Sequence, residues 1–409
     1  MNNKKFISLA LGCTVFALSA NAQKIKGGWN QLNPVHYAVT SLALAPDARA
    51  AGLGDVGAAT DPDVNSQYWN PAKYPFCISR GGVSLNYTPW LRSIVDGIDL
   101  ANVTGYMRLG DYDALSGSLR YFSLGDVYVG NTEDIIRPYE MALDVAYSRM
   151  LSETFSAAVA LRFIHSDLGT HDDERTPGSA FAADIALYHN GYINIGQREC
   201  QLSWGLNASN IGSKISYDGG HKNEFIPTNL RLGMALLVPI DEYNSITFAA
   251  DANKLMVPTM PTYIQFLEQI HPEVDLTGDV ISTEYQDEYN WWLQEEGYNN
   301  VSPITGMFKS FSDAPGGFKE ELQEVQWSVG AEYSYNNQFF IRGGYHHEHP
   351  NKGNRKYFTV GAGFKMNVFS IDAGYVISTA QSNPLDQTVR FSLAFDLDGI
   401  QDILGKRRR

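Results

Sequence analysis

Residues 100–122 read LANVTGYMRLGDYDALSGSLRYF, and this stretch decides the fold. Apolar and polar side chains alternate along it, with a turn-forming break at 110–113. Val103 and Met107 share one face of a predicted strand, whereas Asn102 points the opposite way. Alternation with a period of two residues is typical of a strand with one apolar face. The stretch therefore predicts two antiparallel strands joined by a short turn.

The same alternation recurs along the chain and predicts about fourteen strands, an even number, as in single-chain bacterial outer-membrane barrels. The predicted strands are 83–87, 102–109, 115–121, 141–147, 155–163, 181–189, 202–208, 230–236, 246–250, 325–335, 339–345, 358–364, 369–377 and 389–395.

The connections between these strands alternate in length. The odd-numbered ones are long: 91–100, 123–140, 165–179, 212–228, 254–324, 346–355 and 378–386. The even-numbered ones are mostly short: 110–113, 151–154, 238–244, 336–337 and 366–367, with a longer span at 190–199. Short periplasmic turns and long extracellular loops are the pattern of outer-membrane barrels, and a soluble sandwich has no reason to show it. We therefore predict an all-β protein, an antiparallel outer-membrane barrel over residues 82–395.

The start of the chain predicts export. Lys4 and Lys5 precede a short apolar run, 6–18, and Ala20-Asn21-Ala22 forms a cleavage site, so residues 1–22 are expected to be a signal peptide. The run is too short for a membrane-spanning helix. With 37 glycines, 12% aromatic and only 19% charged residues, the composition suits a β-rich protein whose outer face is not in water, although it alone also allows a soluble sandwich.

The charge limits the kinds of binding partner, and the cysteine content limits the number of disulfide bonds. The acidic balance, with a net charge of −14, argues against nucleic acid. Beyond the signal peptide only Cys77 and Cys200 remain, which is no disulfide framework, and a single bridge between them stays open.

The segment 23–81 does not alternate like a strand. It is dense in small residues around Gly52, Gly54 and Gly57, which permit close backbone packing. This spacing matches a dinucleotide-binding fingerprint only by chance, because no strand precedes it. We expect the segment to be a hatch inside the lumen, and residues 396–409 to be a periplasmic tail.

The hatch also carries a resemblance. Ala51–Thr60 (AGLGDVGAAT), Asn65-Ser66 and Asn70-Pro71-Ala72 resemble the N-terminal hatch of the FadL superfamily of fourteen-stranded barrels. The fuller string, 46–74 together with 87–92, closely resembles the PorV (LptO) family of type IX secretion. The residues that carry the hatch motif are Gly52, Gly54, Gly57, Trp69, Asn70 and Pro71.

This resemblance implies a shuttle rather than an enzyme. Members of that family associate with the large translocon barrel and bind the C-terminal signal domain of cargo. They then deliver cargo to a surface attachment complex, where it is anchored to lipopolysaccharide of the outer membrane. The resemblance implies no cofactor. The alternative, implied by the wider superfamily, is a channel for fatty acids or other hydrophobic small molecules, which needs an apolar interior pocket.

The connection 254–324 gives an independent reason to expect a surface partner. It is far longer than usual, and such loops are commonly functional or disordered. Between Tyr263 and Glu324 it has thirteen acidic residues against Lys309 and Lys319. Disordered acidic tracts are poor in aromatics, whereas this loop is rich in them, so it is expected to fold and to bind a partner, unless the aromatics only pack it onto the rim. The candidate partner-binding residues are Tyr285, Tyr289, Trp291, Trp292, Tyr298, Phe308 and Phe311.

Catalysis has weak support in the sequence. A barrel deacylase acting on lipid A needs a serine within hydrogen-bond reach of an oriented histidine. His165 and Ser166 are neighbours, so on one strand they face opposite sides. His189 is expected to face lipid, with no serine that the sequence places beside it.

Metal binding and transport through the lumen are also weakly supported. His346-His347-Glu348-His349 has suitable ligand types. It lies in a predicted connection without an identifiable fourth ligand, so a solvated polar turn is expected. The predicted lumen-facing charged residues are expected to pair with one another; they are Arg108, Arg120, Asp144, Arg162 and Asp184.

Overall fold

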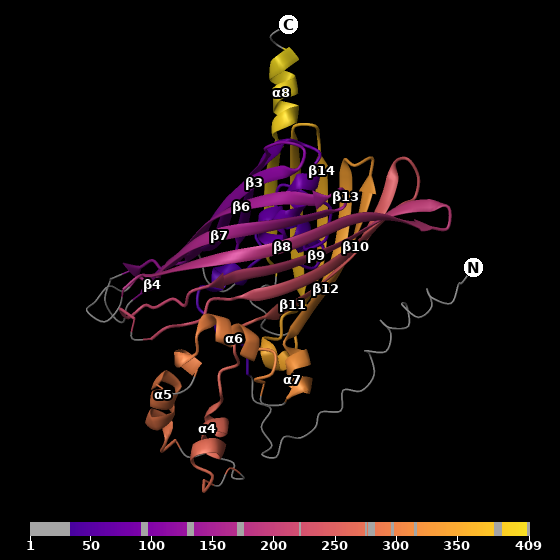
Figure 1. Cartoon of the computed structure of the whole chain (residues 1–409). Coiled ribbons are helices and arrows are strands. Elements are labelled where there is room, and N and C mark those ends of the chain that lie inside the picture. Colours follow the sequence, from indigo (N-terminus) through magenta and orange to yellow (C-terminus); the bar gives the residue numbers. More distant parts are fainter. Residues whose placement is uncertain are drawn as a thin grey trace.

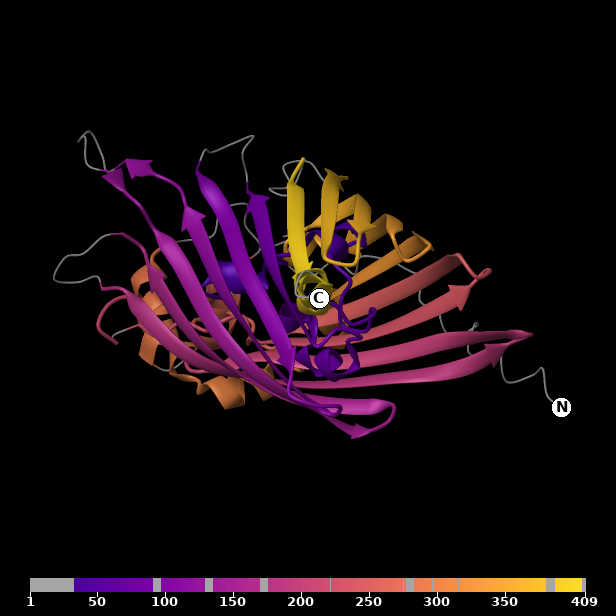
Figure 2. The same cartoon turned by 90° about the horizontal axis from the view of Figure 1, so that it is seen from above.

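The computed structural model describes residues 33–90, 97–128, 135–169, 176–220, 222–274, 276, 283–295, 298–314, 317–379 and 387–406. The expected signal peptide lies outside these residues. Within them, fourteen strands form one closed barrel in which sequential neighbours pair antiparallel and β1 pairs with β16 (Figures 1 and 2). The barrel strands are β1 (Gly81–Pro89), β2 (Ile98–Arg108), β3 (Asp113–Leu124), β6 (Tyr139–Ser152), β7 (Phe155–Asp167), β8 (Gly178–Ile195), β9 (Arg198–Gly212), β10 (Asn229–Pro239), β11 (Asn244–Leu255), β12 (Val325–Tyr335), β13 (Phe339–His347), β14 (Lys356–Lys365), β15 (Phe369–Ser378) and β16 (Val389–Asp396).

The predicted alternation is present in the barrel wall. Along β1 the side chains of Val83 and Leu85 are exposed on the outside, whereas Ser84 and Asn86 are buried inside. An apolar outer face and a polar inner face are what a barrel in lipid requires. The pair of strands that closes the barrel, β1 and β16, has Val83 opposite Phe395. Among the described residues, no helix is long and apolar enough to cross a membrane.

Two boundaries differ from the sequence-based expectation. The span 190–199 is not a loop, because β8 and β9 continue through it to a turn at 196–197, with Ile193 paired to Cys200. The connection 123–140 contains a small hairpin of β4 (Val127–Tyr128) and β5 (Ile135–Ile136).

The two ends of the barrel are unlike. We call the end that carries the long connections the loop mouth. The helices of the long loop lie at this end: α4 (Tyr263–Ile270), α5 (Gln286–Glu295), η4 (Tyr298–Asn300), α6 (Pro303–Lys309) and α7 (Phe318–Gln323) (Figure 1). We call the opposite end, which carries α8 (Leu397–Lys406), the tail mouth (Figure 1). The expected tail, 396–409, is therefore helical over most of its length. A further short helix, η5 (Pro350–Lys352), lies in the connection between β13 and β14.

The described part of the segment before β1, residues 33–80, lies inside the barrel (Figure 2). Its helices are η2 (Thr40–Ala43), α2 (Ala48–Gly52), α3 (Ser66–Trp69) and η3 (Pro71–Phe76). At its start the Asn33 N–H donates to the carbonyl of Asn351 in the connection between β13 and β14. At its end the Arg80 N–H donates to Asp398 of α8. The chain therefore runs through the lumen from the loop mouth to the tail mouth.

Candidate functional site

The hatch begins with a capped turn of helix. Asp47 accepts hydrogen bonds from the Ala50 N–H at 2.9 Å and the Trp69 indole N–H at 2.6 Å, so one carboxylate caps α2 and fixes α3. The Asn70 side-chain amide donates to the carbonyls of Ala58 and Leu187, the latter on β8. Pro71 starts η3, where its missing N–H costs nothing. These contacts place Trp69 and Asn70 in the buried interior of the hatch.

The hatch glycines allow backbone to pack directly on backbone. A Cβ on Gly52 would lie 2.9 Å from the Gly361 Cα on β14. Gly54 has φ of +78°, and a Cβ there would lie 2.7 Å from the Tyr345 backbone nitrogen on β13. Gly57 packs against the ring of Trp69. The glycine spacing noted in the sequence therefore serves close packing, of the hatch on the barrel wall at Gly52 and Gly54 and within the hatch at Gly57.

Charged groups attach the hatch to several strands. Arg49 pairs with Asp63 at 2.8 Å and with Glu332 of β12 at 3.0 Å. Asp55 pairs with Arg390 of β16 at 2.5 Å. Asp251 of β11 accepts from the Gly57 N–H at 2.8 Å and the Ala58 N–H at 3.0 Å. Three separate strands thus hold the hatch in one position.

The expected pairing of lumen charges holds for three of the five residues. Arg162 lies 3.2 Å from Asp144 and 2.9 Å from Asp184, all three on neighbouring strands. Arg108 instead donates to the carbonyls of Cys77 and Asp111. Arg120 donates to the carbonyls of Ser41 and Leu44 in the hatch segment.

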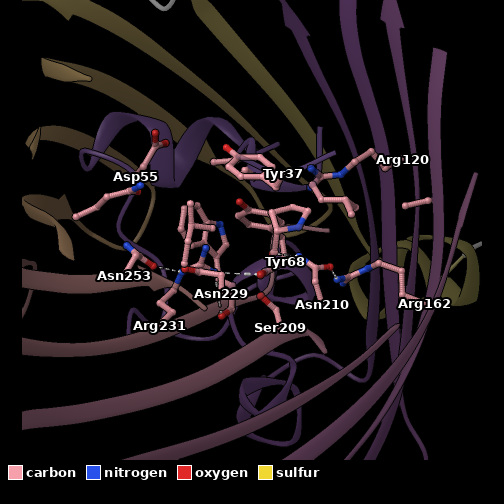
Figure 3. Close-up of a pocket in the computed structure, with 18 of the residues that line it drawn as sticks. Tyr37, Asp55, Tyr68, Arg120, Arg162, Ser209, Asn210, Asn229, Arg231 and Asn253 are labelled. Carbon is pink, nitrogen blue, oxygen red and sulfur yellow. Dashed lines mark hydrogen bonds between the residues drawn. The ribbon is translucent and has the colours of Figure 1, made fainter. Parts of the chain in front are cut away.

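A cavity lies in the lumen between the hatch and the loop mouth (Figure 3). It has about 910 Å³ of open space, counting the part continuous with solvent. Arg120, Arg162 and Arg231 reach it from the barrel wall, while Tyr37 and Tyr68 reach it from the hatch segment. The charged and amide groups among its lining make this a polar interior.

The long loop has a hydrophobic core of its own. Tyr289 and Tyr298 are buried there with Phe266 of α4 and with Phe225 from the connection between β9 and β10. Tyr285 and Trp292 pack against the same core. The Tyr298 hydroxyl donates to the carbonyl of His36 at 3.0 Å. The loop is therefore folded against the hatch segment, and four of the seven candidate aromatics serve its packing.

Other aromatic residues stay on the loop surface. Trp291, Phe308 and Phe311 have exposed fractions of 56%, 72% and 46%. Phe318 of α7 is 78% exposed, although its sequence context did not single it out. Ile304 is exposed as well, and we call the exposed apolar side chains of α5, α6, α7 and the segment between α6 and α7 the loop-surface residues: Trp291, Ile304, Phe308, Phe311 and Phe318.

Ion pairs tie the loop to the barrel. The Lys254 ammonium lies 3.0 Å from Glu321 and 2.6 Å from Glu324. Glu324 also pairs with Lys352 at 3.0 Å. Nearby, Asp313 accepts from the Thr259 N–H, and burial raises the pKa of the Asp313 carboxyl to about 6. Sequence reasoning missed this cluster because Lys254 lies on an outward position of β11 and is covered only once the loop has folded.

The histidines considered for catalysis or metal binding have other environments. His165 and Ser166 do face opposite sides, but the His165 Nδ1 lies 3.0 Å from the Ser179 Oγ on β8, a neighbour that only the strand register reveals. His189 stacks on Trp204. The expected solvated turn at 346–349 is wrong, because His346 lies on β13 and Glu348 is buried in an ion pair with Arg355. Within the described residues, no group of three suitable side chains is placed to hold a metal ion.

Cys77 and Cys200 are both buried free thiols in this structure. Cys77 lies just after η3, and Cys200 lies on β9.

Comparison with known proteins assigns the chain to a family. The family model for the type IX secretion system protein PorV matches residues 29–262, more than half of the chain. The chain belongs to the PorV family. The match includes the described hatch residues, 33–80, and the barrel strands from β1 through β11. Most of the long loop, from residue 263 on, and β12–β16 lie beyond it.

Other comparisons gave weaker likenesses. No curated protein matches in sequence. Among solved structures, the toluene transporter TbuX of Ralstonia pickettii has 12% identity and a TM-score of 0.45, covering 86% of this chain and 97% of that one. A FadL homologue of Pseudomonas aeruginosa has 12% identity and a TM-score of 0.42, covering 86% and 98%. The toluene transporter TodX of Pseudomonas putida has 10% identity and a TM-score of 0.42, covering 90% and 98%.

Proposed function

We propose that this outer-membrane barrel is the shuttle component of type IX secretion. In this role it binds the C-terminal signal domain of cargo leaving the translocon barrel and hands the cargo to the surface attachment complex. Membership of the PorV family supports a role in type IX secretion. The folded loop supports a shuttle that acts through its outer surface. The observation that carries the proposal is the set of loop-surface residues, which stay exposed although the loop has a core of its own.

The chemistry of the loop-surface residues suits protein recognition. Aromatic side chains contribute strongly to interface energetics when a partner covers them, Trp above all. The acidic residues of the loop add a negative field that steers a basic partner and speeds association at low salt. Because Tyr289 and Tyr298 are already buried in the loop core, we assign partner contact to Trp291, Phe308 and Phe311, together with Phe318.

The channel alternative finds less support in the interior. A path for hydrophobic molecules needs an apolar pocket, whereas the lumen cavity is lined by Arg120, Arg162 and Arg231. Neighbouring barrel strands are all hydrogen-bonded to one another over the described residues, so a lateral opening in the wall is not seen there.

A loop replacement tests the proposal. Residues 263–320 are exchanged for a short Gly/Ser linker, which keeps Glu321 and Glu324 beside Lys254 and so leaves no buried lysine unpaired. A finer variant combines Phe308→Ser with Phe318→Ser. The control is Ile240→Ser, an exposed apolar residue on the turn between β10 and β11 at the tail mouth.

The readouts are barrel abundance, cargo on the cell surface and co-purifying partners. We expect the barrel to fold in every variant, and cargo display to be lost in the loop replacement and reduced in the double variant. Normal cargo display from a normally folded loop replacement would refute the proposal and direct attention to the lumen.

A further inference from the structure

The helix α8 begins at a fixed point on the barrel. The Asp396 carboxylate accepts the N–H groups of Asp398 at 3.0 Å and Gly399 at 3.1 Å, as a residue that caps the start of a helix does. The same carboxylate accepts the Ser79 hydroxyl at 2.8 Å, and the Asp398 carboxylate accepts the Arg80 N–H at 2.8 Å. The first turn of α8 is therefore tied to the last residues of the hatch segment.

Close packing fixes the direction of α8 as well. Gly399 lies directly against the backbone of Asn367, in the turn between β14 and β15, where a Cβ would clash. The Leu397 side chain packs against Gly81 at the start of β1. In Figure 1, α8 projects from the tail mouth, and Figure 2, which looks into the barrel from that mouth, shows the helix end-on. The helix therefore points away from the barrel.

The rest of α8 is amphipathic, and its apolar face is uncovered. Ile403 and Leu404 follow Ile400 by three and four residues, so the three side chains lie on one side of the helix. Ile403 is 53% exposed and Leu404 is 58% exposed, so the described part of the chain leaves this face in water. Asp402 lies on the opposite face. Burial of the two exposed aliphatic side chains against a partner would be favourable.

The charge next to this face indicates what kind of partner fits it. Lys406 ends α8, and the sequence continues with Arg407, Arg408 and Arg409, so four positive charges follow the apolar turn directly. One cation is favourable at a helix C-terminus, but this effect does not extend beyond the last turn, and adjacent like charges repel one another. A surface that is apolar and has carboxylates at one end would complement both features.

The geometry argues against the membrane as the partner. An amphipathic helix that binds lipid lies in the plane of the membrane surface. The contacts at the first turn of α8 instead hold it pointing away from the barrel. The tail mouth carries the short turns, which face the periplasm in outer-membrane barrels. A helix of ten residues extends about 15 Å from that mouth, so a soluble periplasmic protein can reach its last turn.

We propose that α8 is a docking helix for a periplasmic protein. That protein binds Ile400, Ile403 and Leu404 in an apolar groove, and it binds the basic run 406–409 with carboxylates at the end of the groove. Binding an amphipathic helix by its apolar face is a common mode of protein recognition. This interface lies at the opposite end of the barrel from the long loop, so it is independent of the loop surface and goes beyond the shuttle function.

Photo-crosslinking in living cells tests the contact directly. The photoreactive residue p-benzoylphenylalanine replaces Leu404 in one variant and Asp402, on the opposite face, in the other. We expect a crosslink to one periplasmic protein from position 404 and much less from position 402. The crosslinked product is identified by mass spectrometry. No crosslink from position 404, or a crosslink only to lipid or to a second copy of this chain, would overturn the proposal.

The identified protein is then purified and titrated with the purified full-length barrel in detergent. The Ile403→Ser, Leu404→Ser double variant should bind at least about tenfold more weakly than the wild type. The matched control, Asp402→Asn, should bind like the wild type. The two apolar side chains are exposed, so the double variant should fold normally, which the abundance of the barrel in cells checks.

The basic run is tested by salt. The affinity of the wild type should fall as sodium chloride is raised, and this fall should be smaller in the Arg407→Gln, Arg408→Gln, Arg409→Gln triple variant. Equal affinity of the wild type and the double variant would refute docking by the apolar face. Binding that does not depend on salt would refute the acidic partner.

Discussion

The contact between Gly54 and β13 makes a sharp test of how the hatch is held. Gly54 combines φ of +78° with a position where a Cβ would lie 2.7 Å from the nitrogen and 2.9 Å from the oxygen of Tyr345. Gly54→Ala therefore meets two penalties. The left-handed backbone costs an L-residue about 1–2 kcal/mol. Overpacking against fixed backbone adds about 1–3 kcal/mol, so the total loss is about 2–5 kcal/mol.

The free energy of unfolding is measured by urea titration of the purified barrel, and seating of the hatch by thermolysin cleavage within residues 46–64. We expect a lower urea midpoint and faster cleavage in Gly54→Ala. The matched control is Gly110→Ala on the turn between β2 and β3, where an added Cβ meets nothing within 4 Å. Gly54→Asn separates the two penalties, because asparagine tolerates positive φ but still carries a Cβ. Equal midpoints and cleavage rates for Gly54→Ala and Gly110→Ala would refute this account of the hatch.

Two further predictions concern the wall and the loop. Phe391→Lys on β16 places a charge on the lipid-facing side opposite Tyr87 and should cost about 2–4 kcal/mol. Barrel assembly in cells should therefore be impaired more by Phe391→Lys than by Val389→Lys, which lies near the end of the strand. Equal assembly of both variants would contradict the assigned register. Because the pKa of Asp313 is raised to about 6 from 3.8, the folded loop binds a proton more tightly than the unfolded one, so loop stability should rise as pH falls from 7 through 6 toward 4. Tryptophan-fluorescence melts at pH 7 and 5 should show this rise in the wild type and a smaller rise in Asp313→Asn; an unchanged rise would assign it to other groups.

The barrel could be predicted because its signal is local. The side chain of Val83 points out and that of Ser84 points in simply because neighbouring residues on a strand face opposite sides. The same reasoning failed at 190–199, where β8 and β9 continue as a ribbon whose residues are mostly exposed. No apolar face is needed there, so the alternation fades although the strand pairing does not.

The details of the site depend on contacts that sequence spacing does not encode. Tyr298 meets the carbonyl of His36 across 262 positions of chain, and Lys254 meets Glu321 across 67. An aromatic residue in a long acidic loop can pack inward or face a partner, and only the fold separates Tyr289, which is buried, from Phe308, which is exposed.

The passage of residues 33–80 through the lumen has a consequence for how the protein is made. The hatch bonds to β11, β12 and β16, which are synthesised long after it, so it cannot be seated when it first emerges. Once β1 has joined β16, a segment that leaves at both mouths is enclosed by a continuous ring of hydrogen bonds. If the β1–β16 seam closes last, the ring seals around a segment that is already inside it, and residues 33–80 need not be drawn through a finished barrel.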